Sequence, residues 1–135
     1  MKKILLSIFM IIVTAGCFDK TPNCSDEIVK NEVIKLYRDH TIKELAEMDI
    51  EMALLMGLAG VDKKDLENKI KEFKTTKITI EHIRTTSIDK AIKRHSCLGT
   101  LKYQLDGESI SEKISYSFQP TDDGKNIWIQ IDSIE

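Results

Sequence analysis

The sequence predicts an α+β domain in which two or three N-terminal helices pack on a four-stranded antiparallel meander sheet. Apolar residues recur at helical spacing between residues 25 and 73, and from residue 76 onward they alternate with polar residues, as in half-buried strands. Short turns separate the strand segments, and Asp106-Gly107 is a strong signal for a tight hairpin. Because the helices precede the strands along the chain, we expect the helices on one face of the sheet.

The first helix is expected over residues 25–40. Ser25 is suited to cap its N-terminus, and two acidic residues follow in the first turn, where negative charge favours the helix dipole. Residues 41–44 match a capping box, so either a second helix begins at Thr41 or the first helix continues with a bend. The apolar face that should contact the sheet includes Val33, Leu36 and Tyr37.

An apolar run covers residues 52–61. A segment that is apolar on all sides is typical either of a buried helix end or of an exposed contact patch, and this one is too short to span a bilayer. If it is a contact patch, Met52, Leu55 and Met56 are candidate residues for binding a protein partner. A further helix should follow over residues 62–73, with Asp62 as its cap and a surface of mostly Lys and Glu.

Alternation along the four strands assigns each side chain to one face of the sheet. The apolar set should face the helices: Leu101, Tyr103, Ile114, Tyr116, Phe118, Ile129 and Ile131. The opposite face should carry Lys102, Gln104, Trp128, Gln130 and Asp132. A tryptophan among polar neighbours on an open face is typical of a binding anchor, so Trp128 is a candidate for partner binding. If Trp128 lies beneath the helices, it belongs to the core instead.

The N-terminus has the parts of an export signal: Lys2 and Lys3, an apolar run over residues 4–13, and Thr14-Ala15-Gly16 before Cys17. This arrangement resembles the lipobox of bacterial lipoproteins, apart from Thr14, where lipoboxes more often carry leucine. The resemblance implies cleavage before Cys17 and lipid, such as palmitate, on that cysteine. The alternatives are a non-lipid secretory signal and a transmembrane anchor, which needs about 20 apolar residues.

On the lipobox interpretation, residues 1–16 form a signal peptide, residues 17–23 a short tether and residues 24–135 a single domain. The lipid on Cys17 would make the membrane one partner and hold the protein in the cell envelope, facing the periplasm. Lipoproteins with Asp after the lipidated cysteine tend to stay at the inner membrane. Phe18 stands there in this chain, so the resemblance implies the outer membrane where the host has two.

Lipid on Cys17 would leave Cys24 and Cys97 as an even pair. Such a pair usually oxidises outside the cytoplasm, and the long loop that a disulfide would close corresponds to about 4 kcal/mol in the chain-entropy account. Two alternatives stay open. A zinc site would need more clustered Cys and His ligands, and a nucleophilic Cys97 beside His95 would need an orienting group.

No motif predicts catalysis, a cofactor or a metal ion, because zinc-binding, nucleophile-elbow and phosphate-loop patterns are absent from the sequence. After cleavage the chain would hold 18 basic and 22 acidic residues, which gives no electrostatic case for nucleic-acid binding.

We therefore expect a non-catalytic protein-binding module of the cell envelope, such as an inhibitor, an immunity or exclusion factor, or an assembly accessory. The protein partner is unidentified. The alternative is a small-molecule carrier with a cavity between sheet and helices. The order of elements over residues 25–135 resembles the cystatin/NTF2-like group, which implies a curved sheet with a concave face used for ligands or partners. This resemblance carries over no catalytic residue.

Overall fold

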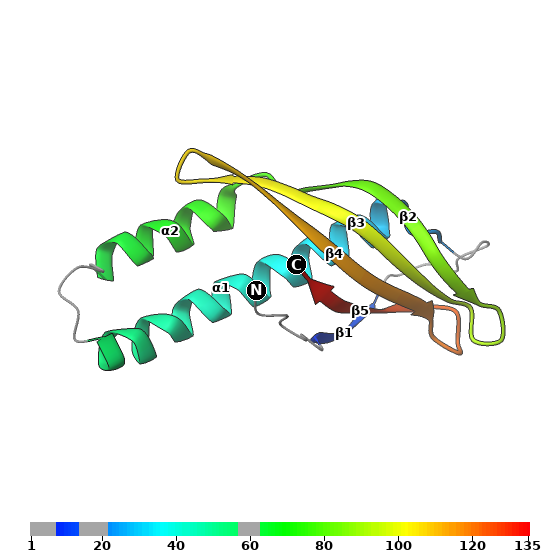
Figure 1. The fold of residues 1–135 in the computed structure, drawn as a ribbon. Coiled ribbons are helices and arrows are strands. Elements are labelled where there is room, and N and C mark those ends of the chain that lie inside the picture. Colours follow the sequence, from blue (N-terminus) through cyan, green and yellow to red (C-terminus); the bar gives the residue numbers. More distant parts are fainter. Residues whose placement is uncertain (1–7, 14–21, 57–62) are drawn as a thin grey trace.

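The computed structural model describes the chain over residues 8–13, 22–56 and 63–135, and the side chains over residues 22–47 and 63–135. A long twisted sheet lies against α1, and α1 and α2 extend together past one end of the sheet (Figure 1). In chain order the elements are β1 (Ile8–Val13), α1 (Glu27–Met56), α2 (Lys63–Thr75), β2 (Thr79–Asp89), β3 (Arg94–Leu105), β4 (Glu108–Pro120) and β5 (Asn126–Ile134).

The four C-terminal strands form the expected antiparallel meander, in the order β5-β4-β3-β2. The hairpin between β3 and β4 turns at Asp106 and Gly107, whose φ angles of 53° and 77° are those of a tight turn with two left-handed residues. The predicted hairpin is therefore confirmed. A strand that alternation did not predict, β1, pairs antiparallel with β5 and makes the sheet five-stranded.

The first helix is longer than the expected 25–40, because α1 continues without interruption through the capping-box residues to Met56. Of the two alternatives for residues 41–56, the structure has the continuous helix. The expectation that Ser25 caps α1 is wrong. The carbonyl of Asp26 accepts the first helical hydrogen bond, from Lys30 N at 2.9 Å, so Asp26 and not Ser25 stands at the cap position. Ser25 belongs to the turn before the helix, where its backbone N–H donates to the side chain of Asn23.

The core lies between the helices and one face of the sheet. The strand residues predicted to face the helices are fully buried there, except Tyr103, which is half-buried. Tyr103 nevertheless joins both helices to the sheet, since its ring packs 5.4 Å from Phe73 of α2 and 6.0 Å from Tyr37 of α1. From α1, Val33 and Leu36 complete the contact, as the helical spacing predicts.

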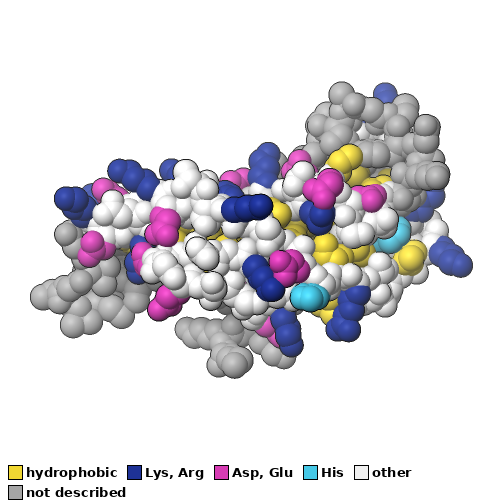
Figure 2. All heavy atoms as spheres, turned by 90° about the horizontal axis from the view of Figure 1, so that it is seen from above, with side chains coloured by type: hydrophobic (Ala, Val, Ile, Leu, Met, Phe, Trp, Pro, Cys, Tyr) yellow, Lys and Arg dark blue, Asp and Glu magenta, His cyan; other side chains and the backbone are white. Residues whose placement is uncertain are grey.

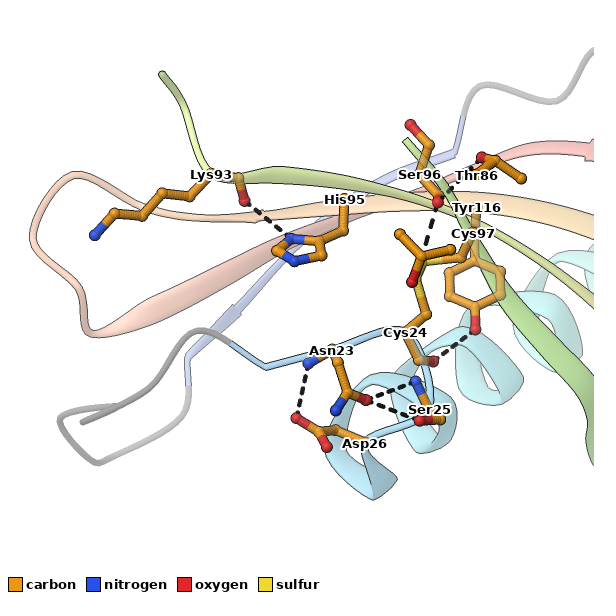
Figure 3. The surroundings of a disulfide bond; sticks show 11 residues. Asn23, Cys24, Ser25, Asp26, Thr86, Lys93, His95, Ser96, Cys97 and Tyr116 are labelled. Atoms are coloured by element: carbon orange, nitrogen blue, oxygen red, sulfur yellow. Dashed lines mark hydrogen bonds between the residues drawn. A yellow bond between two sulfur atoms is a disulfide. The ribbon is translucent and has the colours of Figure 1, made fainter. Parts of the chain in front are cut away.

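A disulfide fastens the start of α1 to the sheet. Cys24 and Cys97 have Cα atoms 5.8 Å apart and are bonded through sulfur, which confirms the predicted pair (Figure 3). The buried Tyr116 hydroxyl donates to the carbonyl oxygen of Cys24 at 2.7 Å, and Thr85 Oγ1 lies 3.2 Å from the Cys24 sulfur. Residues of β2, β3 and β4 therefore all contact Cys24, just before the start of α1.

Candidate functional site: the outer face of the sheet

The face of the sheet away from the helices carries a group of polar and aromatic side chains from β3, β4 and β5. Trp128 lies on it, because its neighbours Ile127 and Ile129 are buried on the helix side. The strand pairing places Gln119 beside Trp128 and Ser117 beside Gln130. We call the surface formed by Arg94, Ser117, Trp128, Gln130 and Asp132 the outer-face cluster. The sequence prediction that Trp128, Gln130 and Asp132 share this face is confirmed.

Arg94 contacts two members of the outer-face cluster, Trp128 and Ser117. Its guanidinium lies 5.8 Å from the centroid of the Trp128 ring, within the range of a cation–π contact. The same group donates a hydrogen bond of 2.9 Å to Ser117 Oγ, and Ser117 Oγ in turn lies 3.4 Å from Asp132 Oδ1. Side chains from β3, β4 and β5 therefore form one network of contacts, which runs from Asp132 through Ser117 and Arg94 to the Trp128 ring.

A bulge in β5 gives Asp132 its position. Tyr116 pairs with Ile131, but Ser115 pairs with Ser133, so Asp132 is an extra residue in β5 without a partner position in β4. Such an extra residue redirects its side chain and bends the strand. Here the side chain of Asp132 is aimed at Ser117. On the next rung, the hydroxyls of Ser115 and Ser133 lie 2.7 Å apart and continue the polar surface.

Partial burial shifts the pKa of the Asp132 carboxyl. Desolvation raises the pKa of the Asp132 carboxyl, while the hydrogen bond from Ser117 and the positive charge of Arg94 oppose that rise. Ser117 itself is completely buried, although it points to the outer face. Its hydroxyl has partners on both sides, so this buried polar group is satisfied before any ligand arrives.

A shallow groove of about 500 Å³ continues from the cluster toward the C-terminus. It is lined by polar and charged side chains with a few apolar ones, which include His82, Arg84, Leu98, Lys113 and Glu135. The groove lies on the surface of the sheet. On the other face, the described apolar side chains of the sheet and the helices form one buried cluster. An open groove beside a partly exposed tryptophan suits contact with a protein surface better than enclosure of a small molecule.

The side chains of the other predicted site residues are not among those that the structure describes. Cys17 falls outside the described residues. Met52, Leu55 and Met56 lie in the last turns of α1, but their side chains and residues 57–61 are not among those described. The proposed patch at 52–61 therefore stays a prediction. Among the described residues, no cluster of His, Cys, Asp and Glu is arranged to hold a metal ion.

Comparisons with protein-family models, curated proteins and solved structures found no match. The resemblances to lipoproteins and to the cystatin/NTF2-like group therefore stay predictions from the sequence. In the described part of the chain, no helix has the length and apolar content needed to cross a bilayer.

The sequence did not identify Arg94 and Ser117 as members of the site. In the sequence, the apolar alternation of this strand runs from Cys97 to Leu105, so Arg94 falls outside it, whereas β3 starts at Arg94. Ser117 carries no chemical signal of its own beyond alternation with Tyr116 and Phe118. Extending the predicted strand back to residue 94 on the same alternation would have placed Arg94 on the face of Trp128.

Proposed function

We propose that the mature chain is a lipid-anchored protein of the cell envelope that binds another protein through the outer face of its sheet. The class of function is an inhibitor, an immunity or exclusion factor, or an assembly accessory. The membrane tether comes from the lipobox resemblance at residues 14–17. The binding surface comes from the outer-face cluster, and Trp128 held by Arg94 is the observation that carries the proposal.

The residue types of the cluster support protein binding. Tryptophan and arginine are the side chains that most often dominate the energy of protein interfaces, and here they are in contact with each other on an otherwise polar surface. Because Arg94 is also bonded to Ser117, both side chains are ordered in advance. An ordered anchor loses less conformational entropy when a partner binds.

The edge of β5 adds a second way to bind. Cleavage before Cys17 would remove β1, whose backbone pairs with β5 from Asn126 to Ile131. The β5 edge would then offer backbone N–H and C=O groups directly beside Trp128. An extended segment of a partner could add to this edge, so that main-chain hydrogen bonds supply affinity and the Trp128 side chain supplies specificity.

Site-specific photo-crosslinking in intact cells tests the binding surface. A photoreactive amino acid at Gln130, next to Trp128 on the outer face, should give one discrete adduct with another protein. The matched control is the same probe at Glu67, an exposed position on α2. The proposal expects the adduct from position 130 to disappear with Trp128→Ala. Adducts from position 67 alone, or from neither position, would contradict it.

The tether has its own test. Cys17→Ser removes the thiol to which the lipid would attach, so the variant should accumulate as an unprocessed or soluble form. Intact mass and membrane fractionation of the variant and the wild type measure this. A Cys17→Ser protein that sediments with membranes at the mass of the wild-type mature chain would refute the lipid anchor.

A further inference from the structure

Three large apolar side chains stand out because they are exposed on an otherwise polar surface. Ile28, Ile88 and Ile92 are 44%, 52% and 48% exposed, and they are the exposed large hydrophobics of the described chain. Ile28 lies in the first turn of α1, whereas Ile88 and Ile92 lie at the end of β2 and in the turn that joins it to β3. All three segments are at the end of the domain where the chain enters (Figure 1).

Basic residues accompany the two isoleucines of the β2–β3 turn. Lys90 and Lys93 are exposed in the same turn, where the Asp89 carboxylate accepts a hydrogen bond from Ala91 N at 3.0 Å. Hydrophobic side chains lie beside basic ones at the corresponding end of the molecule in Figure 2. Isoleucine flanked by lysine suits the boundary between acyl chains and anionic headgroups of a membrane.

The chain geometry places this turn close to the predicted lipid. Pro22 lines a surface hollow together with Ala91, Ile92 and Lys93, so the entering chain passes directly beside the turn. Cys17 precedes Pro22 by five residues, and five fully extended residues reach at most about 18 Å. The lipid on Cys17 would therefore hold the β2–β3 turn within a short distance of the bilayer surface.

We propose that the β2–β3 turn is a membrane-contact element, with Ile88 and Ile92 in the interface and Lys90 and Lys93 at anionic headgroups. This inference rests on the proposed lipid at Cys17. It fixes an orientation: the turn faces the bilayer, and the opposite end, where the β3–β4 hairpin lies, points away from it (Figure 1).

Lipid quenching of a single tryptophan tests the contact. Trp128 is the only tryptophan of the chain, so Trp128→Phe gives a silent background into which Ile92→Trp is introduced. The control is Ser109→Trp in the same background, an exposed position on the β3–β4 hairpin. The variants are expressed from the full-length sequence and purified in lipidated form. They are then placed in phosphatidylethanolamine–phosphatidylglycerol vesicles, with and without brominated acyl chains. Ala91→Trp serves as a second reporter in case Ile92→Trp does not fold.

Intact mass is measured first on the same samples, to separate the contact from the anchor. With lipid present, the inference expects emission from the Ile92→Trp variant to be blue-shifted and quenched by brominated chains, and emission from the Ser109→Trp variant to be unaffected. Lipidated protein without quenching at position 92, or with equal quenching at both positions, overturns the contact while the anchor stands. If position 92 is not quenched, Ile88 and Ile92 would contact a protein instead of the membrane. Absence of lipid on Cys17 overturns both.

Discussion

The guanidinium of Arg94 lies 5.8 Å from the centroid of the Trp128 ring and donates a hydrogen bond to Ser117 Oγ. This contact joins β3, β4 and β5 across the outer face of the sheet. Among the described side chains, it orders Trp128, the aromatic residue that lies with polar neighbours on that face. Arg94 is therefore a positioning residue for the proposed anchor.

Removing Arg94 should uncover Trp128. Arg94→Ala should shift the emission of the single tryptophan to longer wavelength and make it more accessible to iodide. It should also lower the free energy of unfolding by about 1–2 kcal/mol, since the cation–π contact and a hydrogen bond are lost. Lys113→Ala, an exposed residue farther along the same face, is the control. Unchanged emission of the Arg94→Ala variant would show that Arg94 does not cover the ring.

The Asp132 carboxyl should make stability depend on pH. Burial raises its pKa in the folded state, so the folded protein binds more protons than the unfolded chain in the window just above the unfolded pKa. The free energy of unfolding should therefore fall as the pH rises through the raised pKa. Asp132→Asn should lack this contribution. Urea unfolding of both proteins from pH 3 to pH 7 measures the difference, and curves that stay parallel would contradict the prediction.

The Tyr116 hydroxyl should stabilise the start of α1. Burial raises its pKa to about 12, so it keeps its proton and donates to the Cys24 carbonyl throughout the neutral range. Tyr116→Phe leaves that carbonyl without this donor and should cost about 1–3 kcal/mol of unfolding free energy. Tyr103→Phe is the matched control and should cost less, because Tyr103 is only half-buried and its hydroxyl partner, the Tyr37 hydroxyl, also bonds Glu112. Equal losses for the two variants would refute the assignment.

The disulfide should contribute a large share of the stability. It closes a loop between positions 73 residues apart, and the double variant Cys24→Ala, Cys97→Ala should lose about 4 kcal/mol of unfolding free energy. Reductant should have a comparable effect on the wild type and none on the variant. If reductant leaves the urea midpoint of the wild type unchanged, the bond does not stabilise the fold.

Much of the sheet could be predicted because its signals are local. Alternation placed Ile129 on the helix side and Trp128 outside, and the Asp106-Gly107 pair fixed the position of one hairpin. The cysteine pair followed from parity once Cys17 was assigned to lipid. Each of these inferences needs only neighbouring residues or a count.

The remaining features depend on contacts between segments that are distant in sequence. Thr41 and Glu44 form a capping-box pattern, but α1 runs through them without a break. His82 has a left-handed φ of 52° and marks an irregularity in the β2–β3 pairing, which is not expected for a residue other than glycine. The hydrogen bonds from Arg94 to Ser117 and from Ser117 to Asp132 depend on the register of three strands and on the bulge in β5, and no local pattern encodes these.

The affinity of the Trp128→Ala variant tests the central claim most directly. The partner is the protein crosslinked through position 130, and binding is measured by titration of purified proteins. Trp128 is half-buried, so the variant should stay folded, with a loss of about 1 kcal/mol in stability from the cation–π contact. The account predicts that binding weakens by about 2 kcal/mol, roughly 30-fold, while Glu67→Ala, at an exposed position on α2, changes little. A folded Trp128→Ala variant that binds with wild-type affinity would contradict it.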